Sequence, residues 1–301
     1  MKNITFHQLK KYICESYDVG EYEEILCELF EVDDISEITK ENYNKLLQDY
    51  EHDKLNEHDS SLLEEATLLV HQAANENGYN IIAHHGTTVE FSEFEYGDIG
   101  FHVGSLDQAE VAASRHDNTN KKNIIYLNTA ISLHNPLVIN YDLGNWYPNE
   151  IFDGACTELN GYFEKERKKY PSLKRDELYN KIEDKLKNVQ LGTDWEWDGV
   201  AQLYFLFNEL NFSISKIKKY NFSASTMQKK VILDKLISRG YDGIKYLNFY
   251  ETKEGKPKEY SYILLDANQI KNCEVISFSN GKVVPLENRF NKNTNNLFET
   301  I

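Results

Sequence analysis

The chain has 301 residues, of which 41% are hydrophobic and 27% charged, an ordinary globular composition with enough length to bury a substantial core. Its formal net charge of −16 disfavours tight, nonspecific binding to a phosphate backbone, because such binding depends on cation contacts that release counterions. Four widely spaced cysteines without a CxxC pair argue against a disulfide framework and against a zinc knuckle.

Hydropathy and charge patterning bear on compartment and partners. No apolar run resembles a signal peptide or a membrane span, so we expect a soluble, cytoplasmic protein with no membrane partner. Residues 1–80 hold six lysines and nineteen acidic residues, whereas residues 213–239 hold seven basic residues and one acidic residue. Each segment can be a solvated face, and the basic one can alternatively dock an acidic target, nucleic acid included.

The first 58 residues predict an acidic helical N-terminal region. Apolar residues recur at helical spacing from residue 6 to residue 55, which indicates two or three amphipathic helices, the first around residues 9–13. A further helix is predicted from about Ser60 to Asn75, with Ser60 or Ser61 as its N-cap and Gly78 at its end.

Two groups of short, β-branched and aromatic segments predict strands. These segments are residues 79–85, 98–104, 123–131 and 136–141, and then 243–249, 260–266 and 273–278. Helical periodicity fills most of the stretch between the groups and ends with a helix over about 225–238. The pattern predicts an α+β fold with a core of residues 59–145 and 236–285, a mostly helical insertion over 146–235, and a polar tail over 286–301.

The tripeptide His85-Gly86-Thr87 stands where a predicted strand ends. A glycine there lets a ligand approach the backbone closely, and the imidazole and hydroxyl groups supply polar contacts at one point in space. An ordinary strand end can carry the same residues, so the tripeptide alone is weak evidence. A second predicted strand, bracketed by Gly100 and Gly104, follows and can form the opposite wall of a cleft.

Further motifs follow in a fixed order along the chain. They are Gln108-Ala109, Tyr126-Leu127-Asn128, Asn135-Pro136-Leu137, Gly240-Tyr241-Asp242-Gly243-Ile244, the stretch from Tyr246 to Glu251, and the stretch from Ser261 to Lys271. In this order and at these distances, the segments resemble the ADP-ribosyltransferase domains of phage and mobile-element polyvalent proteins. Those domains belong to the superfamily of diphtheria toxin and the poly(ADP-ribose) polymerases. The resemblance covers about residues 60 to 275 without the insertion, and it depends on these motifs occurring in register with the His-Gly-Thr tripeptide and the glycine-bracketed strand.

The resemblance implies a split β-sheet fold that cleaves NAD and transfers ADP-ribose to a macromolecular acceptor without a metal. In such a fold the Gly86 backbone would hold the nicotinamide carboxamide, and the side chains of His85 and Thr87 would contact the ribose on the adenosine side. The positions implied to contact NAD are His85, Gly86, Thr87, Phe101, His102, Gly104 and Asn248.

The resemblance makes Glu251 the catalytic carboxylate, assisted by His85. Breaking the bond between nicotinamide and ribose develops oxocarbenium-like charge, as in glycoside cleavage, and an anion on the 2′-hydroxyl stabilises that charge. The polymerase branch places its glutamate where this chain has Ser261, so the carboxylate must come from Glu251 or Glu259. We favour Glu251, because Glu259 follows a Lys/Gly/Pro turn typical of a solvated strand edge. The paired ExE of the arginine-modifying branch does not occur between Asn248 and Ser261, where Glu251 and Glu259 lie.

Other functions remain open at this point. A catalytically inactive transferase fold that binds NAD, a protein or a nucleic acid is the main alternative. A glycosidase-type carboxylate pair has no spacing that singles it out, and no HExxH, P-loop or GxGxxG motif occurs. A metal site built from His84, His85, His102 and His116 has no supporting spacing. The family's setting suggests a toxin or phage-conflict effector, with an antitoxin or inhibitor as a further partner, and the acceptor can be protein or nucleic acid.

Overall fold

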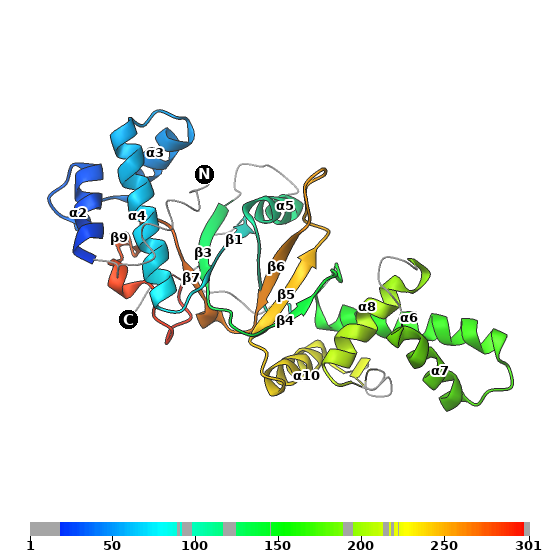
Figure 1. Ribbon diagram of the computed structural model, residues 1–301. Helices are drawn as coiled ribbons and strands as arrows, with labels where there is room; N and C mark the ends of the chain where they lie inside the picture. Colours follow the sequence, from blue (N-terminus) through cyan, green and yellow to red (C-terminus); the bar gives the residue numbers. More distant parts are fainter. Residues whose placement is uncertain are drawn as a thin grey trace.

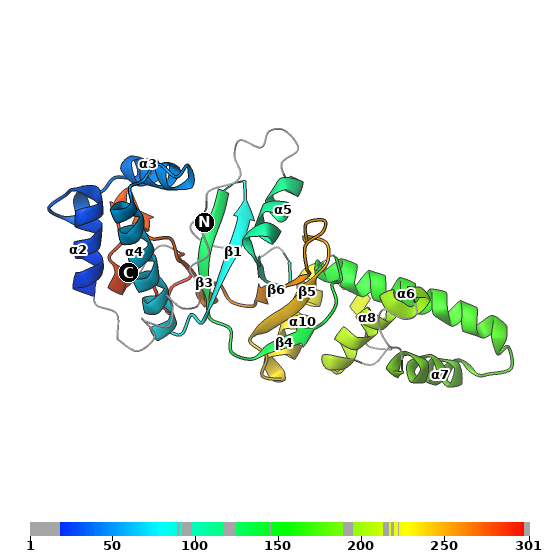
Figure 2. The same cartoon turned by 45° about the horizontal axis from the view of Figure 1, so that its top comes forward.

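A computed structural model describes residues 19–88, 91, 98–116, 125–144, 146–188, 195–212, 217, 220–221 and 223–297. The helix predicted around residues 9–13 lies outside this part of the chain. The fold is a mixed α+β arrangement in which two small sheets lie centrally. The N-terminal helices lie on one side of the sheets and the helices of the insertion on the other (Figures 1 and 2).

The described N-terminal region consists of helices α2 (Val19–Phe30), α3 (Lys40–Glu51) and α4 (Glu57–Glu76), with the 3₁₀ turn η1 (Ile35–Glu37) between the first two. The N-cap predicted for α4 at Ser60 or Ser61 is wrong. The side chain of Asn56 accepts a hydrogen bond from the Asp59 amide at 2.8 Å, so the helix begins three residues before Ser60. Asn77 caps its C-terminus, and Gly78 follows with a φ of +81°, as a glycine readily does.

The first sheet has the strand order β1 (Ile81–Thr87), β3 (Ile125–Ile131) and β7 (Ile270–Asn272), with antiparallel pairing throughout. The second has the order β2 (Phe101–Val103), β6 (Glu259–Leu264), β5 (Gly243–Asn248) and β4 (Pro136–Ile139). A single antiparallel bridge between His84 and Gly104 joins β1 to the end of β2. The helix α5 (Leu106–His116) follows β2 and packs on β1.

The helical insertion is the crossover between two parallel strands. Strands β4 and β5 pair in parallel, and parallel neighbours need a long connection. Helices α6 (Pro148–Lys169), α7 (Arg175–Lys187), α8 (Trp195–Glu209) and α10 (Ser225–Ser238) supply it. Their apolar side chains, among them Phe152, Phe207 and Ile232, form one buried cluster with residues of β4, β5 and β6.

The C-terminal segment returns to the N-terminal helices. It contains the short strands β8 (Phe278–Ser279) and β9 (Lys282–Val283) and the 3₁₀ turns η3 (Ala267–Gln269) and η4 (Leu286–Asn288). The strand predicted over 273–278 is wrong for residues 273–277, which are irregular. Their apolar side chains are buried because the segment packs against α2 and α4, while Arg289 donates hydrogen bonds to the carbonyls of Glu274 and Val275.

Candidate functional site

His85 and Gly86 lie near the end of β1, in register with Leu127 and Tyr126 of β3. The His85 Nδ1 atom donates to the carbonyl of His102 at 2.9 Å, which ties β1 to β2 two residues before the bridge at Gly104. In the neutral ring, a proton on Nδ1 makes Nε2 the acceptor nitrogen. The imidazole edge is therefore suited to receive a hydroxyl hydrogen.

Gly86 and Gly104 are glycines because of close packing. A Cβ atom at Gly86 would lie 1.9 Å from the carbonyl oxygen of Ala109 in α5. Because this oxygen is a backbone atom, no side-chain rotation can relieve the overlap. A Cβ atom at Gly104 would lie 2.3 Å from Gln108 Oε1 and 2.8 Å from Ser261 Oγ. Both positions thus let α5 approach the sheets, and Gly104 also leaves room for the polar contacts described next.

A continuous chain of hydrogen bonds runs from the start of α5 to Glu251. Ser261 Oγ donates to Gln108 Oε1 at 3.0 Å and accepts from Asn248 Nδ2 at 2.9 Å. The same Asn248 Nδ2 donates to Glu251 Oε2 at 2.7 Å, and Asn248 Oδ1 accepts from the Glu251 amide at 2.9 Å. Gln108, Asn248 and Ser261 are each at most 3% exposed, so the chain is held in the interior and only its end at Glu251 reaches the surface.

The loop that carries Glu251, residues 249–252, is held on the side of strand β4 by Asp142. This buried carboxylate accepts from the Phe249 amide at 3.1 Å and from the Gly144 amide at 2.9 Å. The Tyr250 amide lies at the limit of hydrogen bonding, 3.5 Å away. Asp142 therefore fixes the backbone immediately before Glu251.

The same loop is held on the other side by helix α5. Arg115 Nη1 lies 3.6 Å from Glu251 Oε1, and Arg115 Nη2 donates to the carbonyl of Tyr250. Lys253 forms ion pairs with Asp107 and Glu110 of the same helix, and hydrogen bonding to these carboxylates raises the pKa of Lys253. Helix α5 thus contacts both β1 and the Glu251 loop.

His102 and Tyr246 connect the His85 side of the site to the Glu251 side. His102 Nδ1 lies 3.4 Å from the Tyr246 hydroxyl, and the Trp146 ring packs at a tilt against the Tyr246 ring with centroids 5.0 Å apart. Burial lowers the pKa of His102 to about 4, so its ring is neutral at pH 7. Burial and then the charge of Glu251 raise the pKa of Tyr246, so its hydroxyl stays protonated. Neutral hydrogen-bonding groups therefore separate His85 from the carboxylate.

The expected site residues differ in what surrounds them. His85, His102, Gly104, Asn248 and Glu251 belong to connected hydrogen bonds or to the bridge between the sheets. Thr87 is the last residue of β1, opposite Ile125. Phe101 is 3% exposed in the apolar cluster between the sheets, on the strand face opposite His102, so its side chain contributes packing.

The other carboxylate considered, Glu259, lies at the start of β6 opposite Asn248 and is exposed. Its carbonyl, not its carboxylate, takes part in the network, by accepting from Gln108 Nε2 at 3.1 Å. Of the two glutamates, only Glu251 has its carboxylate in the hydrogen-bond chain formed by the described residues.

Several residues of this site carry no recognisable signal in the sequence. Asp142 and Trp146 come from the connection between β4 and α6, and Arg115 comes from the end of α5. Only the tertiary fold brings Asp142 and Arg115 to the Glu251 loop and Trp146 to Tyr246. Ser261, ruled out as a carboxylate because of its residue type, is the link between Gln108 and Asn248. Ser261 begins one of the sequence motifs, but the motif does not indicate these hydrogen bonds.

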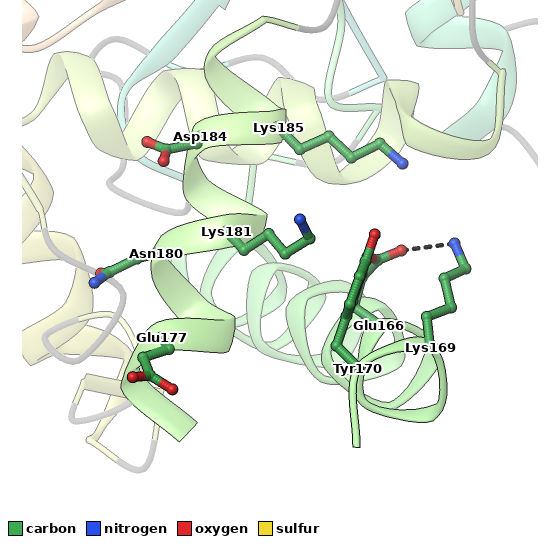
Figure 3. A pocket seen from close by; sticks show the side chains of 8 residues that line it. All are labelled: Glu166, Lys169, Tyr170, Glu177, Asn180, Lys181, Asp184 and Lys185. Atoms are coloured by element: carbon green, nitrogen blue, oxygen red, sulfur yellow. Dashed lines mark hydrogen bonds and ion pairs between the residues drawn. The ribbon is translucent and has the colours of Figure 1, made fainter. Parts of the chain in front are cut away.

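Two further features lie outside this site. Within the described ranges, no cluster of three histidine, cysteine or acidic side chains is arranged to hold a metal ion, and no helix is long and apolar enough to cross a membrane. A groove between α6 and α7 is lined by Lys169, Lys181 and Lys185 but also by Glu166, Glu177 and Asp184, with Lys169 bonded to Glu166 (Figure 3). The equal numbers of each sign give this groove no preference for a charged ligand.

Comparison of the chain with protein-family models, with curated proteins and with solved structures found no match.

Proposed function

We propose that this protein is an NAD-dependent ADP-ribosyltransferase with a split-sheet fold, in which Glu251 is the catalytic carboxylate and His85 positions the dinucleotide. The observation that supports this most directly is the hydrogen-bond chain that joins Gln108, Ser261 and Asn248 to Glu251. It presents one carboxylate, oriented through both its side chain and its backbone amide, on the loop that follows β5. The same strand carries the Tyr246 hydroxyl, which lies 3.4 Å from His102 Nδ1.

In the proposed reaction the bond between C1′ of the ribose and the nicotinamide nitrogen breaks, and its electron pair leaves with neutral nicotinamide. The carboxylate of Glu251 accepts a hydrogen bond from the ribose 2′-hydroxyl and stabilises the positive charge that develops on the sugar. A nucleophilic atom of the acceptor then bonds to C1′ and loses its proton. The His85 imidazole would contact the sugar on the adenosine side, while the neutral His102 and Tyr246 would add no competing charge.

The direct test is nicotinamide release from NAD by the purified protein. Removing one well-placed electrostatic group typically costs about two to three orders of magnitude in rate, so Glu251→Gln should reduce nicotinamide release by about 100- to 1000-fold. Glu259→Gln is the matched control, since that side chain is exposed and outside the network; it should retain wild-type activity. Equal losses of nicotinamide release in the two variants would mean that Glu251 is not the specific catalytic carboxylate. If wild-type protein binds NAD but releases no nicotinamide, the protein is a binding module.

The acceptor and cellular role follow as separate proposals. We expect the acceptor to be a macromolecule and the protein to act as a toxin or phage-conflict effector, with an antitoxin or inhibitor as partner. Incubation of a cell lysate with NAD labelled in its adenosine part, followed by separate protease and nuclease digestion, distinguishes protein from nucleic-acid acceptors. Induced expression should arrest growth with the wild type but not with Glu251→Gln; unimpaired growth with soluble wild-type protein would contradict the toxin role.

A further inference from the structure

Arg115 contacts the Glu251 loop at two points. The residue lies in the last turn of α5, and its guanidinium reaches the carbonyl of Tyr250 with one nitrogen and Glu251 Oε1 with the other, the latter at 3.6 Å. Asn248 holds the second carboxylate oxygen, Oε2, at 2.7 Å. A planar guanidinium suits such a paired contact better than a single ammonium does, because its donors are fixed relative to one another.

Arg115 is also the cation that the described contacts place against Glu251. Lys253, the nearest lysine along the chain, is held by Asp107 and Glu110. Lys258 is also near the loop, but its ammonium lies over the Phe249 ring, 3.6 Å from the centroid. Four further titratable groups face this part of the site, namely Asp142 beside the loop backbone, Tyr246 on β5, and His102 with Asp98 at β2. Asp142 and Asp98 are acidic, and Tyr246 and His102 are neutral at pH 7, so none of these four groups can replace the charge of Arg115.

We propose that Arg115 is a positioning residue for Glu251, which holds the 249–252 loop and keeps the Glu251 carboxylate ionised in the orientation set by Asn248. The role in catalysis rests on the proposed transferase function, whereas the effect on the carboxylate does not. An opposite charge near a carboxylate favours its ionised form. Both side chains are partly exposed, at 46% for Arg115 and 26% for Glu251, so solvent weakens the effect without abolishing it.

The test compares Arg115→Gln and Arg115→Lys with a control of matched geometry. Arg239 forms an ion pair with Glu209 that is also 3.6 Å long and similarly exposed, at the end of α10, so Arg239→Gln removes an equivalent charge elsewhere. Two quantities are measured on the full-length proteins. One is the pKa of Glu251, from carboxyl ¹³C shifts assigned with Glu251→Gln. The other is the pH profile of kcat/KM for nicotinamide release.

We expect Arg115→Gln to raise the pKa of Glu251, and with it the acidic limb of the pH profile, by about 0.5–1 pH unit. Arg115→Lys should restore most of the lower value, and Arg239→Gln should match the wild type. An unchanged pKa of Glu251 in Arg115→Gln would overturn the proposal. So would a rise in KM for NAD with an unchanged pH profile, since the guanidinium would then contact the dinucleotide instead. If the pKa rises but even the wild type releases no nicotinamide, the transferase function fails and the effect of Arg115 on the carboxylate stands.

Discussion

Gly86 shows how a residue that suggests ligand binding can have a packing role that the sequence does not reveal. Its place in a His-Gly-Thr motif suggests an open backbone at a ligand. In the fold, α5 crosses β1 so closely that an added methyl group would lie 1.9 Å from the Ala109 carbonyl oxygen. A ligand contact and this packing need are compatible, because they concern different atoms of the same glycine, but only the packing need follows from the contacts of the described residues.

Gly86→Ala should therefore lower the free energy of unfolding by about 1–3 kcal/mol, since overpacking against backbone forces β1 and α5 apart. Urea denaturation measures this change. The control is Gly161→Ala, in the exposed middle of α6, where an added Cβ meets nothing within 4 Å. That substitution should stabilise the protein by up to about 1 kcal/mol, because alanine is the better helix former. If Gly86→Ala leaves the urea midpoint unchanged or raises it, as Gly161→Ala should, close packing at Gly86 is refuted.

At the scale of elements, the local hydrophobic pattern predicted most strands and helices, and it failed where tertiary contacts decide. The helix predicted over about 225–238 is α10 (Ser225–Ser238), and the segments around 81–87 and 243–248 are strands. Residues 273–277 read as a strand because Cys273, Val275 and Ile276 are apolar. These side chains are buried against α2 and α4. Arg289 donates hydrogen bonds to backbone carbonyls of this segment that would otherwise pair with a neighbouring β-strand.

Helix α4 offers a test of an element boundary. Asn56→Ala removes the side chain that accepts from the Asp59 amide, and losing such an N-cap should cost about 1 kcal/mol of stability. Ser60→Ala lies inside the helix, where alanine is at least as favourable as serine, so its unfolding free energy should match or slightly exceed that of the wild type. Thermal unfolding of both variants measures these changes. A larger loss of stability in Ser60→Ala than in Asn56→Ala would indicate that the helix begins at the predicted N-cap instead.

The same reasoning explains which parts of the site could be predicted. Asn248 and Glu251 are three residues apart in one loop, so a local motif can encode their contact. Asp142 and Arg115 reach that loop from 107 and 135 residues away. Nothing in the sequence around them distinguishes them from other acidic residues and arginines of the chain, so only the assembled fold identifies them.

For the molecule as a whole, the N-terminal helices are part of the packed core. The Tyr22 hydroxyl donates to the Val275 carbonyl at 2.7 Å, and α2, α4 and the C-terminal segment share one apolar cluster. Helices α2 and α3 lie on the opposite side of the sheets from α10, the described end of the basic segment (Figures 1 and 2). A direct contact between this acidic region and α10 is therefore not part of the described fold.

Tyr22→Phe removes the hydrogen bond to the Val275 carbonyl and should therefore lower the free energy of unfolding by about 1 kcal/mol, measured by urea denaturation.

Burial of histidine at the junction between α4 and the first sheet makes the whole fold sensitive to acid. Burial lowers the pKa of His71 to about 4, and neighbouring His84 is lowered in the same direction, chiefly by burial. An unfolded histidine titrates near 6.5, so between about pH 6.5 and 4 the unfolded chain binds more protons than the folded one. The contribution of neutral His71 to stability is therefore complete above pH 6.5 and is lost as the pH falls towards 4.

His71→Gln keeps a polar side chain of similar size that cannot be protonated in this range. Between pH 7 and pH 4, the free energy of unfolding of this variant should therefore fall less than that of the wild type, and the two decreases should differ by about 2 kcal/mol. Carboxylates also titrate in this range, and the difference between the two proteins removes their common contribution. His52→Gln, at the exposed end of α3, should follow the wild-type slope. Parallel pH dependences for His71→Gln and the wild type would mean that His71 is protonated in the folded state at little cost, and that the junction is more solvated than its packing indicates.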